Sequence, residues 1–348
     1  MDTQSVTHSI TRRDFLKVLS LSSLSTAFSS FPIEPYSPAV GLGRVAVSFV
    51  YVYGEPNFRA RRLGHHVRDE LISLLEEISS EEGPSHNPTW YKTPHGYAHS
   101  GNLQIVRWQP QSPEMYISEQ GALFEISIPY TRTYRNPDPS SSPLFRLYYK
   151  STAWVKSVVK GEDGRRWYSV LDDVTGIQYY ARAEHLRKIT EEEISPLSVD
   201  VPWSEKRIEI DLKNQMLRAY EYDRTVLETK ISSGIPDRTP RYNGIPTVTP
   251  SGRFNISRKM PFRHMGDGNL TPDLNAYELP GVPWVCFFHI TGVAVHGTYW
   301  HSDFGRPRSH GCVNVPTETA QWLYRWSSPV VPPDEWMISG YGTPVIVR

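Results

Sequence analysis

The segment that decides this chain runs from Ala294 to Val315 and reads AVHGTYWHSDFGRPRSHGCVNV. It contains Cys312, one of two cysteines in the sequence, and two histidines, His310 and His296, which precede Cys312 by two and sixteen residues. Cysteine attacks mainly as the thiolate, and a neighbouring imidazole favours that form. The spacing predicts that the chain doubles back after His296 and brings its imidazole to the thiol.

The residues around this pair predict strands before it and a helix after it. Residues 284–290 and 293–295 are strand-like, which places His296 at a strand end. Gly311 lets a substrate approach the backbone closely, so the amides of Gly311 and Cys312 are candidate donors to an oxyanion. Apolar residues at 320, 323 and 324 recur at helical spacing and predict a short helix after the cysteine.

Two motifs resemble those of a known family. HGT at 296–298 followed by SHGCVN at 309–314 resembles the signature of the YkuD-like L,D-transpeptidase catalytic domain, and TPSGRF at 249–254 is similar to that family's strand entry. The resemblance covers roughly residues 201–348 and implies a β-rich domain with a flap. It also implies that Cys312 is acylated by a peptidoglycan stem peptide, with release of D-alanine, and that an amine of a neighbouring stem resolves the thioester.

The two histidines of the segment have different expected roles. His296 is the candidate general base, and a backbone carbonyl is expected to fix its tautomer in preference to Asp303. His310 could orient the loop, contact the substrate or act as the base itself. The resemblance implies the orienting role.

Other residues of the segment are candidates for substrate binding. Ser309 and Asn314 could hydrogen-bond either the substrate or the turn. Arg306 could meet a carboxylate of the stem peptide, because guanidinium and carboxylate groups match as planar forks. Gly297 opens the loop beside the base. Tyr299, Trp300 and His301 are interpreted as cavity wall or core.

Three alternatives to this transpeptidase hypothesis stay open. Water could replace the acceptor amine, which would make the enzyme an L,D-carboxypeptidase that trims stem peptides. A metal hydrolase would draw on the crowded ligands His289, His296, His301, His310 and Cys312, but no HExxH pair occurs and we expect no metal and no cofactor. A non-catalytic cell-wall-binding module is the third alternative.

Composition narrows the class of partner. The chain has 348 residues with 37 Lys+Arg and 37 Asp+Glu, so no charge excess points to nucleic acid or an anionic membrane surface. The length allows two or three domains. The 29 prolines, 20 tyrosines and 10 tryptophans favour a mainly β protein.

Residues 1–40 are interpreted as an export signal and linker. The sequence TRRDFLK at 11–17 matches the twin-arginine pattern, and the apolar stretch at 18–28 is too short to span a bilayer. We therefore expect export to the periplasm or cell wall, with no stable membrane anchor after processing. Disulfides can form there, but Cys286 lies in an apolar run and is interpreted as a buried small residue.

Residues 41–110 and 111–200 show a weak internal duplication. Trp90-Tyr91 and Tyr97-Ala98 are echoed by Trp167-Tyr168 and Tyr180-Ala181. Each copy resembles a bacterial SH3-like barrel, the second followed by a linker. Such barrels could bind the cell wall, or Trp90, Trp154 and Trp167 could simply fill two cores. Residues 67–78 have apolar positions at helical spacing and predict an inserted helix.

The catalytic domain is expected at residues 201–348. Alternating apolar residues predict a β-meander over 208–232, and residues 343–347 predict a last strand. Residues 259–283 are rich in glycine and proline and are predicted to form a lid over Cys312.

Overall fold

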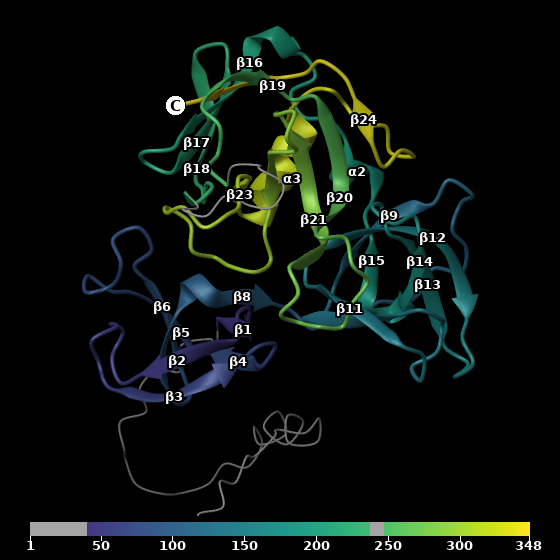
Figure 1. Ribbon diagram of the computed structural model, residues 1–348, viewed down its shortest axis with the longest axis horizontal. Coiled ribbons are helices and arrows are strands. Elements are labelled where there is room, and N and C mark those ends of the chain that lie inside the picture. The colour runs from purple at the N-terminus through teal and green to yellow at the C-terminus, as the bar shows by residue number, and fades with distance from the viewer. Residues whose placement is uncertain (1–39, 237–246) are drawn as a thin grey trace, which may run out of the picture. The chain divides into compact units, whose positions relative to one another are not determined.

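The computed structural model describes residues 40–236 and 247–348 (Figure 1). These residues form a mainly β protein with a few short helices, as the sequence predicts. The twin-arginine motif and the apolar stretch after it lie outside the described residues. No helix within the described ranges is long and apolar enough to cross a membrane.

Residues 41–106 form the first repeat. Its strands make two sheets, in the orders β4-β1-β8 and β3-β2-β7-β6-β5, and a short 3-10 turn, η1 (Ser100–Asn102), precedes β8. The strands are β1 (Gly41–Val45), β2 (Phe49–Tyr53), β3 (Arg62–Val67), β4 (Leu71–Leu74), β5 (Glu76–Ser79), β6 (Thr89–Thr93), β7 (Gly96–His99) and β8 (Leu103–Val106).

Residues 122–188 form the second repeat, a seven-stranded sheet in the order β11-β10-β14-β13-β12-β9-β15. A 3-10 turn, η2 (Ala183–His185), precedes its last strand. The strands are β9 (Ala122–Ile126), β10 (Tyr130–Tyr134), β11 (Pro143–Tyr148), β12 (Thr152–Lys160), β13 (Arg166–Leu171), β14 (Gln178–Arg182) and β15 (Leu186–Lys188).

The two repeats share one scheme of strand pairing. β1 pairs with β4 and β8, as β9 pairs with β12 and β15. β2 pairs with β3 and β7, as β10 pairs with β11 and β14, and β6 lies between β5 and β7 as β13 lies between β12 and β14. This common scheme supports the internal duplication. The assignment of each copy as an SH3-like barrel stays a prediction.

Equivalent positions of the two repeats carry opposite charges. Asp69 and Lys150 are both left-handed, with φ of 66° and 60°, and each amide donates to the carbonyl of the last residue of its repeat's first strand. Arg44 stands one residue before that carbonyl in the first repeat, and Glu125 stands there in the second. The cation and the anion have therefore exchanged places between the copies.

The helix predicted over residues 67–78 is wrong. The segment forms β4 and β5, and burial in β4 alternates, with Ile72 and Leu74 buried and Leu71 and Ser73 exposed. β4 pairs with β1 along its whole length. Apolar residues spaced by three or four can fit a helix, but the backbone of β1 offered a hydrogen-bonding partner that fixed a period of two.

The three tryptophans of the repeats are buried, and Trp154 packs into the cluster that includes Trp284 and Tyr324 rather than into the core of its own repeat. Trp90, Trp154 and Trp167 are each no more than 1% exposed, and the indole of Trp154 donates to the Gln120 carbonyl (3.0 Å). Their interpretation as buried residues is confirmed, but Trp154 does not fill the core of the second repeat, because it joins the cluster formed mainly by residues 208–347. A stacking surface for glycan would have to come from other side chains.

Two five-stranded sheets and a helix make up the described part of residues 206–347. The first has the order β18-β17-β16-β25-β19, and the second has the order β23-β22-β21-β20-β24. The strands are β16 (Lys206–Asp211), β17 (Met216–Glu221), β18 (Arg224–Lys230), β19 (Gly252–Asn255), β20 (Arg258–Gly266), β21 (Glu278–Phe287), β22 (Ala294–Gly297), β23 (Val313–Val315), β24 (Ile338–Ser339) and β25 (Pro344–Val347). Small helical elements precede them: α2 (Glu191–Ile194) and η3 (Trp203–Glu205).

The predicted meander, last strand and helix after the cysteine are confirmed. β16, β17 and β18 pair in sequence, and β25 joins β16 in parallel. The helix is α3 (Thr317–Trp326), which packs against β21 and β22 (Figure 1). Its buried residues Ala320, Leu323 and Trp326 join a core that also takes in both sheets. The loop that carries Cys312 thus lies between strands β22 and β23, and α3 is the next element after β23.

The lid predicted over residues 259–283 is shorter than expected. β20 and β21 pair from Arg258 opposite Phe287 to Gly266 opposite Glu278, so only residues 267–277 are a loop. The glycines and prolines in the segment suggested an irregular connection, but β21 is buried over most of its length and its burial requires a partner strand.

Candidate active site

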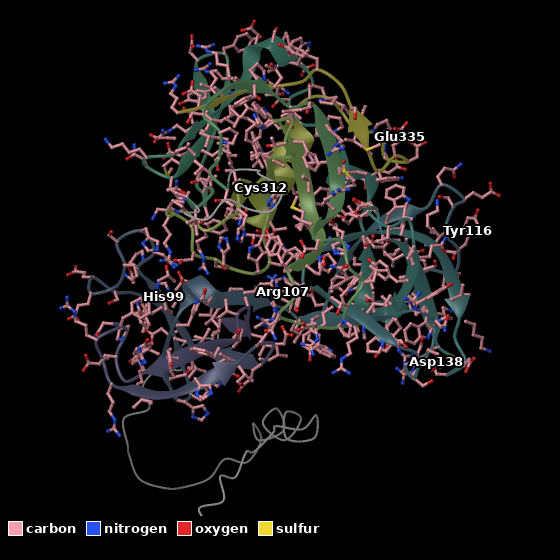
Figure 2. The ribbon with its side chains drawn as sticks, in the orientation of Figure 1. His99, Arg107, Tyr116, Asp138, Cys312 and Glu335 are labelled. Carbon is pink, nitrogen blue, oxygen red and sulfur yellow. The ribbon has the colours of Figure 1, made fainter. Side chains whose placement is uncertain are left out.

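Two adjacent strands deliver the predicted nucleophile and base. Cys312 directly precedes β23, His296 belongs to β22, and the strands run parallel with His296 opposite Asn314. Neighbouring strands lie about 4.8 Å apart. Both side chains line one cavity of about 570 Å³. Figure 2 marks the position of Cys312. The structure therefore brings together the thiol and imidazole that the sequence paired.

The thiol of Cys312 is neutral at rest. It packs against an apolar cluster that includes Met260, Val285 and Ala294, while the residue stays partly exposed to the cavity. Burial raises the pKa of Cys312 to about 11, against a smaller lowering by a hydrogen bond to the Ala294 backbone. Both cysteines are free thiols, and Cys286 is buried as predicted.

The imidazole of His296 is also neutral. It is 2% exposed, and its Nδ1 lies 2.8 Å from the Gly297 carbonyl, which can only accept, so the proton is on Nδ1. Burial lowers the pKa of His296 to about 4, which outweighs the raising effect of that hydrogen bond. The prediction of a backbone carbonyl as the orienting partner is confirmed.

These two environments correct one expectation. The sequence suggested that His296 would favour the thiolate of Cys312. The structure instead raises the pKa of the thiol and lowers that of the imidazole, so the resting pair is neutral. The Nε2 lone pair of His296 stays available to accept the thiol proton when attack begins.

Ser309 and Gly311 hold the nucleophile loop in shape. The Gly311 amide donates to Oγ of Ser309 (3.1 Å), and that hydroxyl donates to the Cys312 carbonyl. Ser309 therefore bonds the turn, the second of its two expected roles. Because the Gly311 amide is engaged here, the Cys312 amide is the stronger candidate for an oxyanion donor. Gly311 has a φ of 125°, which disfavours any side chain.

A second layer of hydrogen bonds braces the same loop from the TPSGRF motif. Oγ1 of Thr249 donates to the Gly311 carbonyl (2.8 Å) and accepts from the Gly234 amide (2.9 Å). The amide of Ser309 donates to the Ser233 carbonyl (3.0 Å). The two motifs that the sequence singled out are therefore joined at the nucleophile.

Asn314 lines the cavity, and only the amide group of its side chain is engaged, because its buried Oδ1 has no hydrogen-bond partner among the described residues. It is 1% exposed, and its amide group is hydrogen-bonded to Nε2 of His301 (3.0 Å). Burial, helped by the charge of Arg308, lowers the pKa of His301 to about 3, so this partner is neutral. Asn314 thus supports the cavity wall through His301.

His310 connects the nucleophile loop to the lid loop. It is exposed at the cavity, its Nδ1 lies 3.2 Å from the Tyr277 hydroxyl, and the two rings meet edge to face at 5.0 Å. Tyr277 is the last residue of the 267–277 loop. This contact favours the orienting role for His310, although the role itself stays a prediction.

Two candidates, Arg306 and Gly297, do not line the cavity. Nε of Arg306 donates to Asp303 (2.6 Å), and its side chain is 52% exposed. Gly297 is buried, and a Cβ there would lie 2.9 Å from Pro283 and 3.1 Å from Thr317. Gly297 therefore allows close packing and supplies the carbonyl that orients His296.

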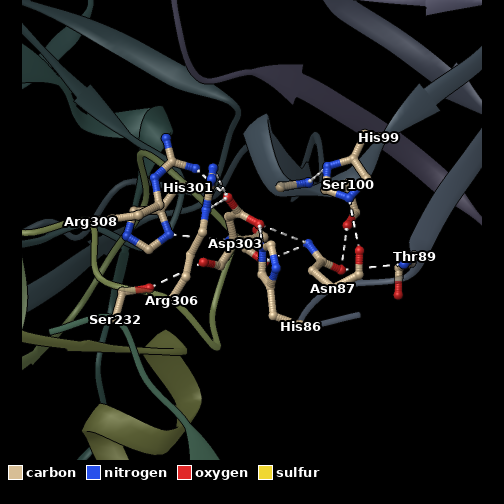
Figure 3. Close-up of polar contacts among 12 residues, drawn as sticks. His86, Asn87, Thr89, His99, Ser100, Ser232, His301, Asp303, Arg306 and Arg308 are labelled. Atoms are coloured by element: carbon tan, nitrogen blue, oxygen red, sulfur yellow. Dashed lines mark hydrogen bonds and ion pairs between the residues drawn. The ribbon is translucent and has the colours of Figure 1, made fainter. Parts of the chain in front are cut away.

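Sequence reasoning missed Arg308 and the network behind it. Arg308 lines the cavity and donates to Asp303 (3.0 Å) and to Asn102 of the first repeat (3.1 Å). Figure 3 shows Asp303 between Arg308, Arg306 and His86, whose Nε2 lies 3.0 Å from its carboxylate. Arg308 was visible beside the motif, but nothing local in the sequence indicates that His86 meets Asp303.

The first repeat also forms part of the cavity wall. Arg44, Ala46, Val47, Ser48 and Arg68 all line it, together with Tyr148 of the second repeat. No sequence signal marked these residues. They were interpreted as parts of separate small domains.

The crowded histidines do not gather around one point. His289 contacts Oγ1 of Thr291 (2.8 Å), and His301 contacts Asn314. Within residues 40–236 and 247–348, no group of three His, Cys, Asp or Glu side chains is arranged to hold a metal.

Comparison with known proteins finds similarity over the C-terminal part of the chain. Residues 205–347 match the model of the L,D-transpeptidase catalytic domain, YkuD. An L,D-transpeptidase structure from Xylanimonas cellulosilytica is 30% identical, with 42% of this chain and 62% of that chain covered and a TM-score of 0.31. A mutant L,D-transpeptidase from Enterococcus faecium is 27% identical, with 42% and 50% covered and a TM-score of 0.31.

The catalytic domain of the E. faecium enzyme alone, solved by NMR, is 29% identical, with 42% of this chain and 98% of that domain covered and a TM-score of 0.30. The chain thus spans less than two thirds of the first two relatives, and no curated protein matches it. The region that holds Cys312 and His296, residues 205–347, is similar to the L,D-transpeptidase catalytic domains of the YkuD family.

Proposed function

We propose that this protein is an exported L,D-transpeptidase that cross-links or remodels peptidoglycan stem peptides through a thioester at Cys312. The observation that carries the proposal is the pairing of β22 with β23, which sets Cys312 and His296 on the wall of one cavity within the family-matched region. A thiol beside a neutral imidazole is the arrangement that acyl transfer requires.

Acylation follows from the protonation states. Nε2 of His296 accepts the thiol proton as Sγ of Cys312 attacks the carbonyl carbon between the third stem residue and D-alanine. The carbonyl oxygen becomes an oxyanion, which the Cys312 amide can receive. When the carbon–nitrogen bond breaks, His296 returns the proton to the departing amine, so D-alanine leaves and a thioester remains.

Transfer to the acceptor reverses these steps. An amine of a second stem attacks the thioester carbon, His296 accepts its proton, and the sulfur leaves as a thiol after that proton returns. Water in place of the amine would give the L,D-carboxypeptidase reaction. The 267–277 loop and His310, joined through Tyr277, lie where they could limit access of water to the thioester.

Mass spectrometry of the acylated protein tests this function. We expect incubation with a carbapenem, which mimics the acyl donor, to add one carbapenem mass at Cys312. Cys312→Ala should give no adduct, and Cys286→Ala, which alters the buried thiol, should keep it. An adduct that survives in Cys312→Ala would contradict the proposal. Tight binding to sacculi with no adduct would favour the wall-binding module.

Export is a separate part of the proposal and rests on the TRRDFLK motif. Replacing both Arg12 and Arg13 by lysine should retain the protein in the cytoplasm, as measured by cell fractionation. Normal export of the double variant would contradict the twin-arginine route.

A further inference from the structure

The cavity over Cys312 is completed by residues outside the family-matched region. The turn between β1 and β2 contributes Ser48, and the residue after β3, Arg68, lies at the same wall. Arg68 also reaches the lid loop, where its Nη1 donates to the Leu274 carbonyl. The first repeat is therefore positioned to contact whatever the catalytic residues bind.

Among the described residues, three guanidinium groups line this cavity, and two of them are paired with a carboxylate. Arg44 pairs with Asp69 (2.7 Å), and Arg308 pairs with Asp303 (3.0 Å). Arg68 differs, because its hydrogen bonds go to neutral oxygens, the Leu274 carbonyl and Oγ of Ser48 (3.2 Å). No carboxylate of the described residues lies within ion-pair distance of Arg68.

The hydrogen-bonding capacity of Arg68 is also incompletely used. A guanidinium carries five N–H bonds. The Nε atom of Arg68 is buried and has no hydrogen-bond partner in the part of the chain that the structure describes. Buried polar groups are normally paired, so an arginine with an unpaired nitrogen and an uncompensated charge is suited to binding an anion.

Glu278 is the carboxylate among the described residues that line the cavity, and it does not neutralise the charge of Arg68. The carboxylate of Glu278 lies 2.9 Å from Nε2 of His264 and accepts hydrogen bonds from the backbone amides of Gly268 and Asn269. Its charge is taken up by these groups. The cavity therefore keeps a positive excess in a chain whose overall charge balances, and a concave site of one sign concentrates ligands of the other.

We infer that Arg68 is a specificity-determining residue that binds a free carboxylate of the donor stem peptide. This inference rests on the proposed transpeptidase function. The donor always carries the carboxylate of its terminal D-alanine, and its third residue can carry a second one on the side chain. Both offer the same chemistry to a guanidinium.

Kinetics with matched donor peptides tests the inference. We expect Arg68→Gln to lower kcat/KM for the fully carboxylated tetrapeptide about 10- to 100-fold, mainly through KM, because a hydrogen bond to a charged group is lost. Arg68→Lys should recover part of the loss. Arg61→Gln changes an exposed arginine of the same repeat that does not line the cavity, and it should match the wild type.

Amidated donors identify the carboxylate. If Arg68 binds the terminal carboxylate, a donor amidated at that carboxylate should show a lower kcat/KM with the wild type and nearly the same kcat/KM with Arg68→Gln. If Arg68 binds the side-chain carboxylate, a donor amidated on that side chain should show the same pattern. Equal losses for every donor would overturn the inference and indicate a structural role. Carbapenem labelling of the wild type separates the two proposals: no adduct would reject the function, whereas an adduct without donor discrimination would reject only the role of Arg68.

Discussion

The chemistry of the site is set by two buried side chains that are both uncharged at rest. Desolvation raises the pKa of Cys312 to about 11 and lowers that of His296 to about 4. A neutral pair avoids placing two charges in an apolar pocket, and it delays charge formation until the thiol attacks. In the proposed mechanism, the proton therefore moves from Cys312 to His296 as the new bond forms.

The pH dependence of acylation should report this neutral pair. We expect the second-order rate constant for carbapenem acylation to stay level across neutral pH and to fall only near pH 4, where His296 becomes protonated and can no longer accept the thiol proton. Rapid-mixing fluorescence or timed mass spectrometry would measure the profile. An inflection near pH 6.5 would contradict it, because it would indicate an imidazole with an ordinary pKa.

His296→Gln should lower that rate constant by about 10²- to 10⁴-fold, the usual contribution of a general base. His95→Gln changes an exposed histidine between β6 and β7 and serves as the control. Equal effects of the two variants would show that His296 is not the base.

At the scale of single residues, the sequence predicted those site residues that lie close together in the chain. Cys312 and His296 lie in one short segment, so motif spacing predicted their meeting. Arg44 and Arg68 reach the same cavity from a different repeat, and their meeting with Cys312 depends on packing between segments about 250 residues apart. No periodicity or motif encodes such a contact.

At the scale of elements, the nucleophile loop depends on a neighbouring segment for its shape. The loop has little regular structure of its own, and Thr249, Ser233 and Ser309 supply the hydrogen bonds that fix it. The position of Cys312 therefore depends on residues of neighbouring segments, such as Thr249 and Ser233, that do not line the cavity. Such supporting contacts are part of the preorganisation of an active site.

Thr249→Val should impair acylation while preserving the fold. Valine has nearly the same shape but leaves the Gly311 carbonyl and the Gly234 amide without their partner, which costs about 1–3 kcal/mol in a buried setting. We expect a lower thermal midpoint and a slower carbapenem reaction. Thr225→Val, on the exposed part of β18, is the control, and unchanged acylation in Thr249→Val would show that the brace is dispensable.

The two element-level errors have a common physical origin. Residues 67–78 and 259–283 were assigned from their own composition and spacing, as a helix and a lid. The first segment formed strand because β1 was available as a partner, and the two ends of the second paired with each other as β20 and β21, which left only residues 267–277 as a loop. By contrast, α3 was predicted correctly because its buried residues Ala320, Leu323 and Tyr324 recur at helical spacing within the segment itself.

At the scale of the molecule, a buried histidine links the second repeat to the catalytic hairpin. His264 of β20 lies 2.7 Å from Asp172 of the second repeat and 2.9 Å from Glu278 of β21, and all three side chains are nearly inaccessible. Burial lowers the pKa of His264, but the hydrogen bonds and charges of Asp172 and Glu278 outweigh it and raise the pKa above its usual value. The protonated form is therefore favoured by folding.

This link should make stability depend on pH. Because the pKa of His264 is higher in the folded state, its contribution is fully present below about pH 6.5 and is lost as the pH rises through the raised value. Thermal unfolding of the wild type and His264→Gln should differ most near pH 6, and the difference should shrink toward alkaline pH. His65→Gln, on the exposed strand β3, is the control, and a gap that widens with pH would contradict the linkage.

The reversed charges of the two repeats have a consequence for how this architecture can be rebuilt. Arg44 and Asp69 of one copy correspond to Glu125 and Lys150 of the other, although the backbones follow the same pairing scheme. A chimera that exchanged the copies would place the carboxylate of Glu125 where the guanidinium of Arg44 now lines the cavity. The two copies share a scheme of strand pairing but differ in the sign of the charges at equivalent positions, so each copy fits only its own surroundings.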